Sequence, residues 1–280
     1  MPTPAAEPVA IGLGTALTLG ALQGVTEFLP VSSSGHIAIG AMLFGIRDAP
    51  LSLSIVLHAG TLLATLILFR KDVARLLIDF AKGLRNPKAW LASDSGKISA
   101  GVIVASIPTA VIGLLLKDSV EAWQSIPWIV GVCLLVSAVM VWTTRRGGGD
   151  AAVLGLGAAL VVGVSQGIAV LPGISRSGTT IAVAMLLGMR GESAFRFSFL
   201  LSLPAVLGAV VLELGKPGAL ASVGLPVWLG GLLATLVGVA SLIILRKLVT
   251  QGRFWAFALY LVPVGLLLIA WPLVMKAFSG

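Results

Sequence analysis

Ten apolar runs separated by short polar segments dominate this sequence and restrict the fold class it can adopt. With 58% hydrophobic and 11% charged residues, the chain has too little polar surface to cover a water-soluble globule of 280 residues. We therefore predict an all-α polytopic integral membrane protein, with a single membrane domain over residues 1–280. The apolar runs are residues 9–29, 35–46, 51–69, 97–116, 126–142, 151–171, 177–189, 197–214, 225–245 and 254–275.

Two of the runs are too short to cross a bilayer. Residues 35–46 and 177–189 each hold about a dozen residues, whereas a spanning helix needs about 20. Each follows a stretch rich in Pro, Ser and Gly that cannot continue a helix. Such irregular backbone is tolerated at membrane depth only when protein or a water-filled cavity provides hydrogen-bond partners for its N–H and C=O groups. We expect two re-entrant helical hairpins, each turning at a serine-rich tip.

The two hairpins belong to an internal repeat with an offset of 143 positions. Over residues 13–47 the two copies share 15 identities in 35 positions, including the pairs Gln23 with Gln166 and Ser32 with Ser175. Each half holds one hairpin and three spanning runs, so the second half starts on the opposite side of the membrane. The sequence thus predicts two inverted-topology repeats, over about 9–142 and 151–275.

Basic residues indicate an orientation. If residues 70–97 form a cytoplasmic loop with an amphipathic surface segment around 72–80, then 14 of the 19 Lys and Arg residues lie on the cytoplasmic side and both termini lie outside. The net charge of +8 is therefore explained by topology, and no nucleic-acid partner is expected. The two hairpin tips should enter from opposite sides and meet near the midplane, among membrane lipids.

Joining the tips brings ionisable side chains together where charge is costly, which favours a functional site. Glu27 and His36 come from the first tip and Arg176 from the second. Arginine and helix amino termini bind phosphate well, and the carboxylate then calls for a bridging divalent cation, Mg²⁺ or Ca²⁺. His36 has the chemistry to attack phosphorus or carry a proton. The surrounding hydroxyls are those of Ser32, Ser33, Ser34, Ser175, Ser177, Thr179 and Thr180.

Two further ionisable residues are given structural roles. For His58, inside the run 51–69, a hydrogen-bonded helix contact is favoured over a supporting role at the site. Glu213 is interpreted as a solvated charge near a helix end.

Both tip motifs are similar to signatures of the undecaprenyl-diphosphate phosphatase (bacitracin-resistance) family. The segment 23–36 ends in Phe-Leu-Pro-Val-Ser-Ser-Ser-Gly-His, and 172–180 reads Pro-Gly-Ile-Ser-Arg-Ser-Gly-Thr-Thr. The resemblance implies a bacterial inner-membrane enzyme that hydrolyses undecaprenyl diphosphate, a polyprenyl diphosphate lipid, to the monophosphate carrier used in cell-wall synthesis, thereby conferring bacitracin resistance.

The resemblance also implies residue roles. Glu27 and Gln23 would hold the metal, His36 would be the nucleophile or acid/base, and Ser33 is an alternative nucleophile; a metal-activated water is a third. Arg176 would clamp phosphate. Its helpers would be the hydroxyls of Ser32, Ser34, Ser175, Ser177 and Thr179.

Two residues depart from the family pattern, and a rival function remains. Gln23 stands where many members have Glu, which removes a charge from the metal site, and Arg196 stands where Glu is common, which suggests a topological or headgroup-binding charge. A polyprenyl-phosphate transporter or flippase is the alternative, since inverted repeats with midplane hairpins also describe carriers. A homodimer is compatible with the sequence, which does not fix the oligomeric state.

Overall fold

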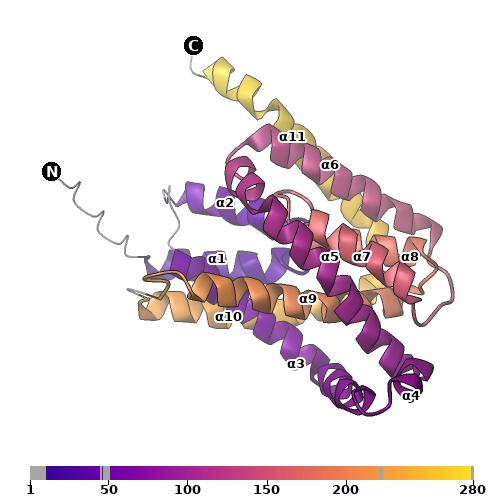
Figure 1. Ribbon diagram of the computed structural model, residues 1–280. Coiled ribbons are helices and arrows are strands. Elements are labelled where there is room, and N and C mark those ends of the chain that lie inside the picture. Colours follow the sequence, from indigo (N-terminus) through magenta and orange to yellow (C-terminus); the bar gives the residue numbers. More distant parts are fainter. Residues whose placement is uncertain (1–10, 45, 47–50, 221–222, 279–280) are drawn as a thin grey trace.

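The computed structural model describes residues 11–44, 46, 51–220 and 223–278, and all ten predicted runs contain a helix in this part of the chain (Figure 1). Six helices, α3, α5, α6, α9, α10 and α11, are long and apolar enough to cross a membrane, which confirms an all-α polytopic membrane protein. The α-helices are α1 (Leu13–Thr26), α2 (Ser33–Leu43), α3 (Leu51–Gly83), α4 (Pro87–Ala92), α5 (Asp94–Trp123), α6 (Pro127–Thr143), α7 (Leu156–Ile168), α8 (Arg176–Leu186), α9 (Gly191–Leu214), α10 (Leu225–Thr250) and α11 (Ala258–Phe278).

The segment 70–97 is not the loop that the sequence predicts. Helix α3 continues to Gly83 because no Pro or Gly interrupts residues 70–82. At 1.5 Å per residue its 33 residues extend about 50 Å, well beyond the apolar core of a bilayer. Arg196 of α9 pairs with Asp72 on this extension, so its charge ties two helices together. This pairing accounts for Arg196 without a lipid headgroup.

The two predicted hairpins are present as helix–turn–helix units. Helix α1 packs against α2, and α7 packs against α8 (Figure 1). Around them, α1 lies against α10 while α7 lies against α5, and α3 contacts α10 while α9 contacts α5. The repeat pairs α1 with α7, α3 with α9 and α5 with α10. Each contact made by one half is therefore matched by the equivalent contact of the other half. The re-entrant depth of the hairpins, the inverted orientation of the repeats and the side on which the termini lie stay predictions. Gly45 and Arg47, which match Gly188 and Arg190 in the repeat, fall outside the described residues.

Matching glycines of the two halves mark close helix crossings. A Cβ built on Gly20 of α1 would lie 2.2 Å from the carbonyl oxygen of Gly230 in α10. Its repeat partner Gly163 in α7 would meet the carbonyl oxygen of Ala105 in α5 at the same 2.2 Å. Small residues at such crossings let helix backbones approach closely. The repeated glycines therefore place both hairpins against their supporting helices.

A substitution at Gly20 tests this packing. Gly20→Ala should destabilise the protein by roughly 1–3 kcal/mol, because backbone, not a flexible side chain, blocks the added methyl group. Gly14→Ala on the same helix is the control, since nothing lies within 4 Å of its Cβ position. The measurement is the thermal unfolding midpoint of each variant in one detergent. Equal midpoints for the two variants would contradict this account of the crossing.

Candidate active site

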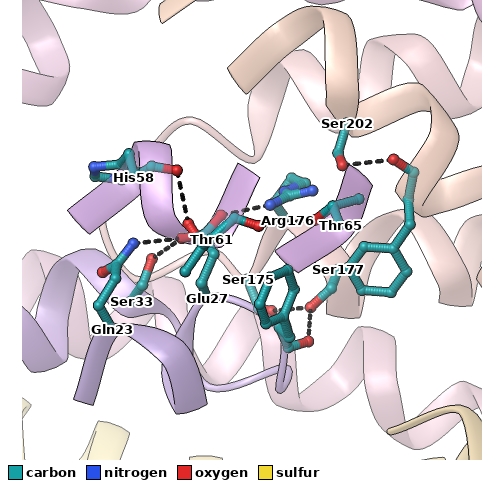
Figure 2. Close-up of polar contacts among 12 residues, drawn as sticks. Gln23, Glu27, Ser33, His58, Thr61, Thr65, Ser175, Arg176, Ser177 and Ser202 are labelled. Atoms are coloured by element: carbon teal, nitrogen blue, oxygen red, sulfur yellow. Dashed lines mark hydrogen bonds and ion pairs between the residues drawn. The ribbon is translucent and has the colours of Figure 1, made fainter. Parts of the chain in front are cut away.

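An ion pair joins the two hairpin tips. Arg176 Nη2 donates to Glu27 Oε1 at 2.5 Å (Figure 2). Glu27 directly follows α1, and Arg176 is the first residue of α8. The two side chains are 10% and 17% exposed, so little water screens their attraction. Of the three ionisable residues that the sequence predicts to meet at the tips, Glu27 and Arg176 do meet.

The second carboxylate oxygen of Glu27 accepts from its own hairpin. Ser33 Oγ donates to Glu27 Oε2 at 2.8 Å, and the Gln23 amide nitrogen donates to the same oxygen at 3.2 Å (Figure 2). Ser33 begins α2, while Gln23 lies one turn before Glu27 in α1. The carboxylate thus orients a serine hydroxyl at the amino terminus of a helix.

Three of the four hydroxyls at the second tip make hydrogen bonds that hold the structure together. Ser177 Oγ donates to the Phe28 carbonyl at 2.8 Å, which links the two tips directly (Figure 2). Ser175 Oγ caps α8 by accepting the Gly178 N–H at 3.1 Å. Thr180 Oγ1 donates to the Arg176 carbonyl at 2.8 Å. Thr179 Oγ1 is buried and has no hydrogen-bond partner among the described residues.

The first tip is also anchored by an aromatic cluster. The Phe28 ring packs against Phe199 of α9 with centroids 5.8 Å apart, and Phe199 packs in turn against Phe195 and Phe69. Phe28 and Phe199 are fully buried. This apolar support fixes the residue next to Glu27.

A cavity of about 260 Å³ opens beside the ion pair. Glu27, Ser33 and Arg176 line its polar part, and α9 contributes an apolar wall with Val206, Ala209 and Val210. Of the other predicted site residues, Ser32 and Ser34 line the cavity. Those that do not line it are Gln23, His36, Ser175, Ser177 and Thr179.

His36 lies away from the ion pair, next to α11. Its Nδ1 is 2.9 Å from the Ser32 carbonyl oxygen, and its Nε2 is 2.6 Å from the Tyr260 hydroxyl. Both ring nitrogens therefore already have partners. Ser32 has a φ of 69°, a conformation that costs a non-glycine residue on the order of 1 kcal/mol.

Sequence reasoning missed four cavity residues. His58 of α3 and Glu213 of α9, given structural roles above, both line the cavity, as do Thr109 and Gln166. His58 Nδ1 is 2.9 Å from the Ser54 carbonyl oxygen, as expected for a helix contact, yet the residue also lines the cavity. The repeat could have pointed to Gln166, because it pairs this residue with Gln23, which the sequence already places at the site. Nothing in the sequence placed Glu213 or Thr109 here.

The residues present fit a metal ion that is held partly by the substrate's phosphates better than one held by protein side chains alone. Among the described residues no group of three or more His, Cys, Asp or Glu side chains gathers as a metal site would require. Glu27 already accepts three hydrogen bonds, leaving about one lone-pair position, and Gln23 turns its amide nitrogen toward it. Mg²⁺ often binds through one carboxylate together with substrate phosphates and water, and Glu27 can serve such an ion.

The arrangement is suited to binding a phosphate. Arg176 Nη1 is buried without a hydrogen-bond partner in the described part of the chain, although Nη2 is engaged by Glu27. The amino termini of α2 and α8 converge on the same place, where their positive dipole ends favour an anion. A phosphoryl group in the cavity would lie beside the Arg176 guanidinium and the Ser33 hydroxyl, because both residues line it.

Comparisons with known proteins agree on one family. The model of the family described as "Bacitracin resistance protein BacA" matches residues 16–267. An undecaprenyl-diphosphatase of Desulforapulum autotrophicum is 44% identical over 264 residues, which cover 90% of this chain and 96% of the relative. Proteins of the same name from Desulfosudis oleivorans and Korarchaeum cryptofilum are 43% and 39% identical over 87% and 92% of the chain, and over 93% and 98% of the relatives.

The contact between the tips can be tested through Ser177. Ser177→Ala should cost about 1–3 kcal/mol of stability, because the Phe28 carbonyl loses its buried donor. Thr18→Ala, which removes an exposed hydroxyl bonded within its own helix, is the control and should change stability by less than about 0.5 kcal/mol. Unfolding in detergent would compare them. Similar small losses in both variants would show that the tips are held together by other contacts.

Proposed function

Because the chain belongs to the bacitracin resistance protein BacA family, we propose that the cavity between the hairpin tips is its active site. The chain is an undecaprenyl-diphosphatase: it hydrolyses undecaprenyl diphosphate to undecaprenyl phosphate and inorganic phosphate, recycling the lipid carrier for cell-wall synthesis. One observation carries the assignment of the site: Arg176, Glu27 and Ser33 are joined by hydrogen bonds at the polar end of a cavity with an apolar wall.

In this proposal Arg176 binds the terminal phosphoryl group. Its guanidinium lines the cavity and donates to a phosphoryl oxygen, while the bond from Nη2 to Glu27 holds it in place. Backbone N–H groups at the start of α2 and α8, with the Ser32 and Ser34 hydroxyls at the cavity wall, are donors for the other oxygens. The α9 wall, with Val206 and Val210, suits the first isoprene units of the lipid.

Ser33 is the nucleophile that the geometry favours. Its Oγ attacks the terminal phosphorus and passes its proton to Glu27, while the bond to the bridging oxygen breaks and undecaprenyl phosphate leaves. Water then hydrolyses the phosphoserine and releases phosphate. Ser33 lines the cavity and is 2.8 Å from the carboxylate, whereas His36 does not line it and both its nitrogens are engaged.

Glu27, rather than Gln23, is the residue that would hold the divalent cation, together with substrate phosphates. The cation would neutralise part of the diphosphate charge when bound. Gln23 instead donates to Glu27 and helps to orient the carboxylate.

The proposed setting is a bacterial inner membrane, in which the six apolar helices place the cavity within reach of a lipid substrate. A homodimer stays a prediction. A flippase is not favoured, because a carrier needs a phosphate clamp but no serine activated by a carboxylate.

Phosphate release tests the site. Arg176→Ala should lower kcat/KM by at least about a hundredfold, because it removes the charge facing the phosphoryl group, and Ser33→Ala by about a thousandfold or more. Arg85→Ala, at an exposed position between α3 and α4, is the charge-loss control and should retain activity. The assay uses purified protein in detergent with a long-chain polyprenyl diphosphate. Full turnover by Ser33→Ala would contradict the role of Ser33 and would indicate that water attacks the phosphorus.

Chelation tests the cation. EDTA should abolish release, and added Mg²⁺ or Ca²⁺ should restore it. Glu27→Gln should lower release, since Ser33 loses its proton acceptor, and the residual rate should need a higher cation concentration for half-maximal stimulation, since the remaining amide is a weaker ligand. Unchanged release in EDTA would show that Arg176 alone balances the phosphate charge.

A further inference from the structure

The turn that presents Ser33 is strained. Ser32 is the one non-glycine residue with positive φ in the described part of the chain, at 69°. The second tip also has a positive φ, 95°, but at Gly173, where glycine adopts it freely. A serine in this conformation needs support from its surroundings.

His36 provides that support. The Ser32 carbonyl oxygen lies 2.9 Å from His36 Nδ1 and 3.4 Å from the His36 backbone nitrogen. Since a carbonyl can only accept, Nδ1 must carry a proton, and the Nε2 of the neutral ring is then an acceptor. The ring thus holds the Ser32 peptide from within α2, one turn after the strained residue.

Tyr260 fixes the other end of the ring. Its hydroxyl is 2.6 Å from Nε2, and the two rings are stacked with centroids 5.9 Å apart and an interplanar angle of 25°. Tyr260 is the single tyrosine of the chain and belongs to α11, which packs against α6. The hydroxyl therefore joins a spanning helix to the hairpin tip by one hydrogen bond.

These contacts form an unbroken series that ends at the proposed nucleophile. Tyr260 contacts His36, His36 holds Ser32, and the next residue, Ser33, donates to Glu27 at 2.8 Å. We propose that Tyr260 is a positioning residue for hydrolysis, acting through His36 to hold the strained Ser32 peptide and aim the Ser33 hydroxyl at Glu27. This inference rests on the proposed role of Ser33.

Two substitutions separate positioning from direct chemistry. Tyr260→Phe keeps the ring and removes only the hydroxyl, so kcat should fall about tenfold with KM nearly unchanged. His36→Asn keeps a side-chain N–H near the position of Nδ1 and loses Nε2, so it should resemble Tyr260→Phe. In the double variant the two losses should not add, because both remove the same hydrogen bond.

The outcomes are distinct. Loss of turnover in His36→Asn to the level of Ser33→Ala, in protein that unfolds at the wild-type temperature, would mean that His36 touches the reacting atoms and would overturn the proposal. Wild-type kcat in Tyr260→Phe would overturn it as well. Additive losses in the double variant would show that the two residues act separately.

A second measurement does not depend on activity. Ser33→Cys in a Cys133→Ala background places one thiol at the tip, and its alkylation rate reports how the tip is held. Adding Tyr260→Phe should change that rate at least about threefold, whereas Thr18→Ala should not. An unchanged alkylation rate would overturn the positioning role of Tyr260, whether or not the wild-type protein releases phosphate. Absence of phosphate release by the wild-type protein would instead count against the proposed function.

Discussion

The ion pair between Glu27 and Arg176 is the interaction on which the site depends. It joins two hairpins from opposite halves of the chain and places a positive and a negative group beside one cavity. Within a membrane protein each charge alone would be costly, so each residue requires the other. The pair also holds the guanidinium at the cavity wall, and it presents a carboxylate oxygen to Ser33.

The rest of the fold serves to bring the tips together. Gly20 and Gly163 let the hairpins approach α10 and α5 closely, while Phe28 and Ser177 fix the tips against α9 and against each other. Most second-tip hydroxyls are used in this scaffold. The division of labour explains why one tip carries the reactive serine while the other carries the arginine with structural hydroxyls around it.

Much of this could be predicted from sequence, because hydrophobic run length and a repeat with polar identities are strong signals. All ten runs, both hairpins and the meeting of Glu27 with Arg176 follow from them. The helical extension of α3 does not follow from the apolar run, which ends at residue 69, although no residue from 70 to 82 breaks a helix. The direction in which a side chain points could not be predicted from the sequence. His36 contacts Tyr260, which is 224 residues away along the chain, whereas His58 and Glu213 line the cavity.

The central claim is that Ser33 is the group that attacks phosphorus, and trapping the intermediate tests it most directly. Protein mixed with a long-chain polyprenyl diphosphate labelled in its terminal phosphate would be quenched within milliseconds in SDS at mildly alkaline pH, where phosphoserine and phosphohistidine both survive, and its peptides mapped. The account predicts the label on Ser33, present in wild type and absent in Ser33→Ala. Label on His36, or full burst release of phosphate with no labelled peptide, would contradict it.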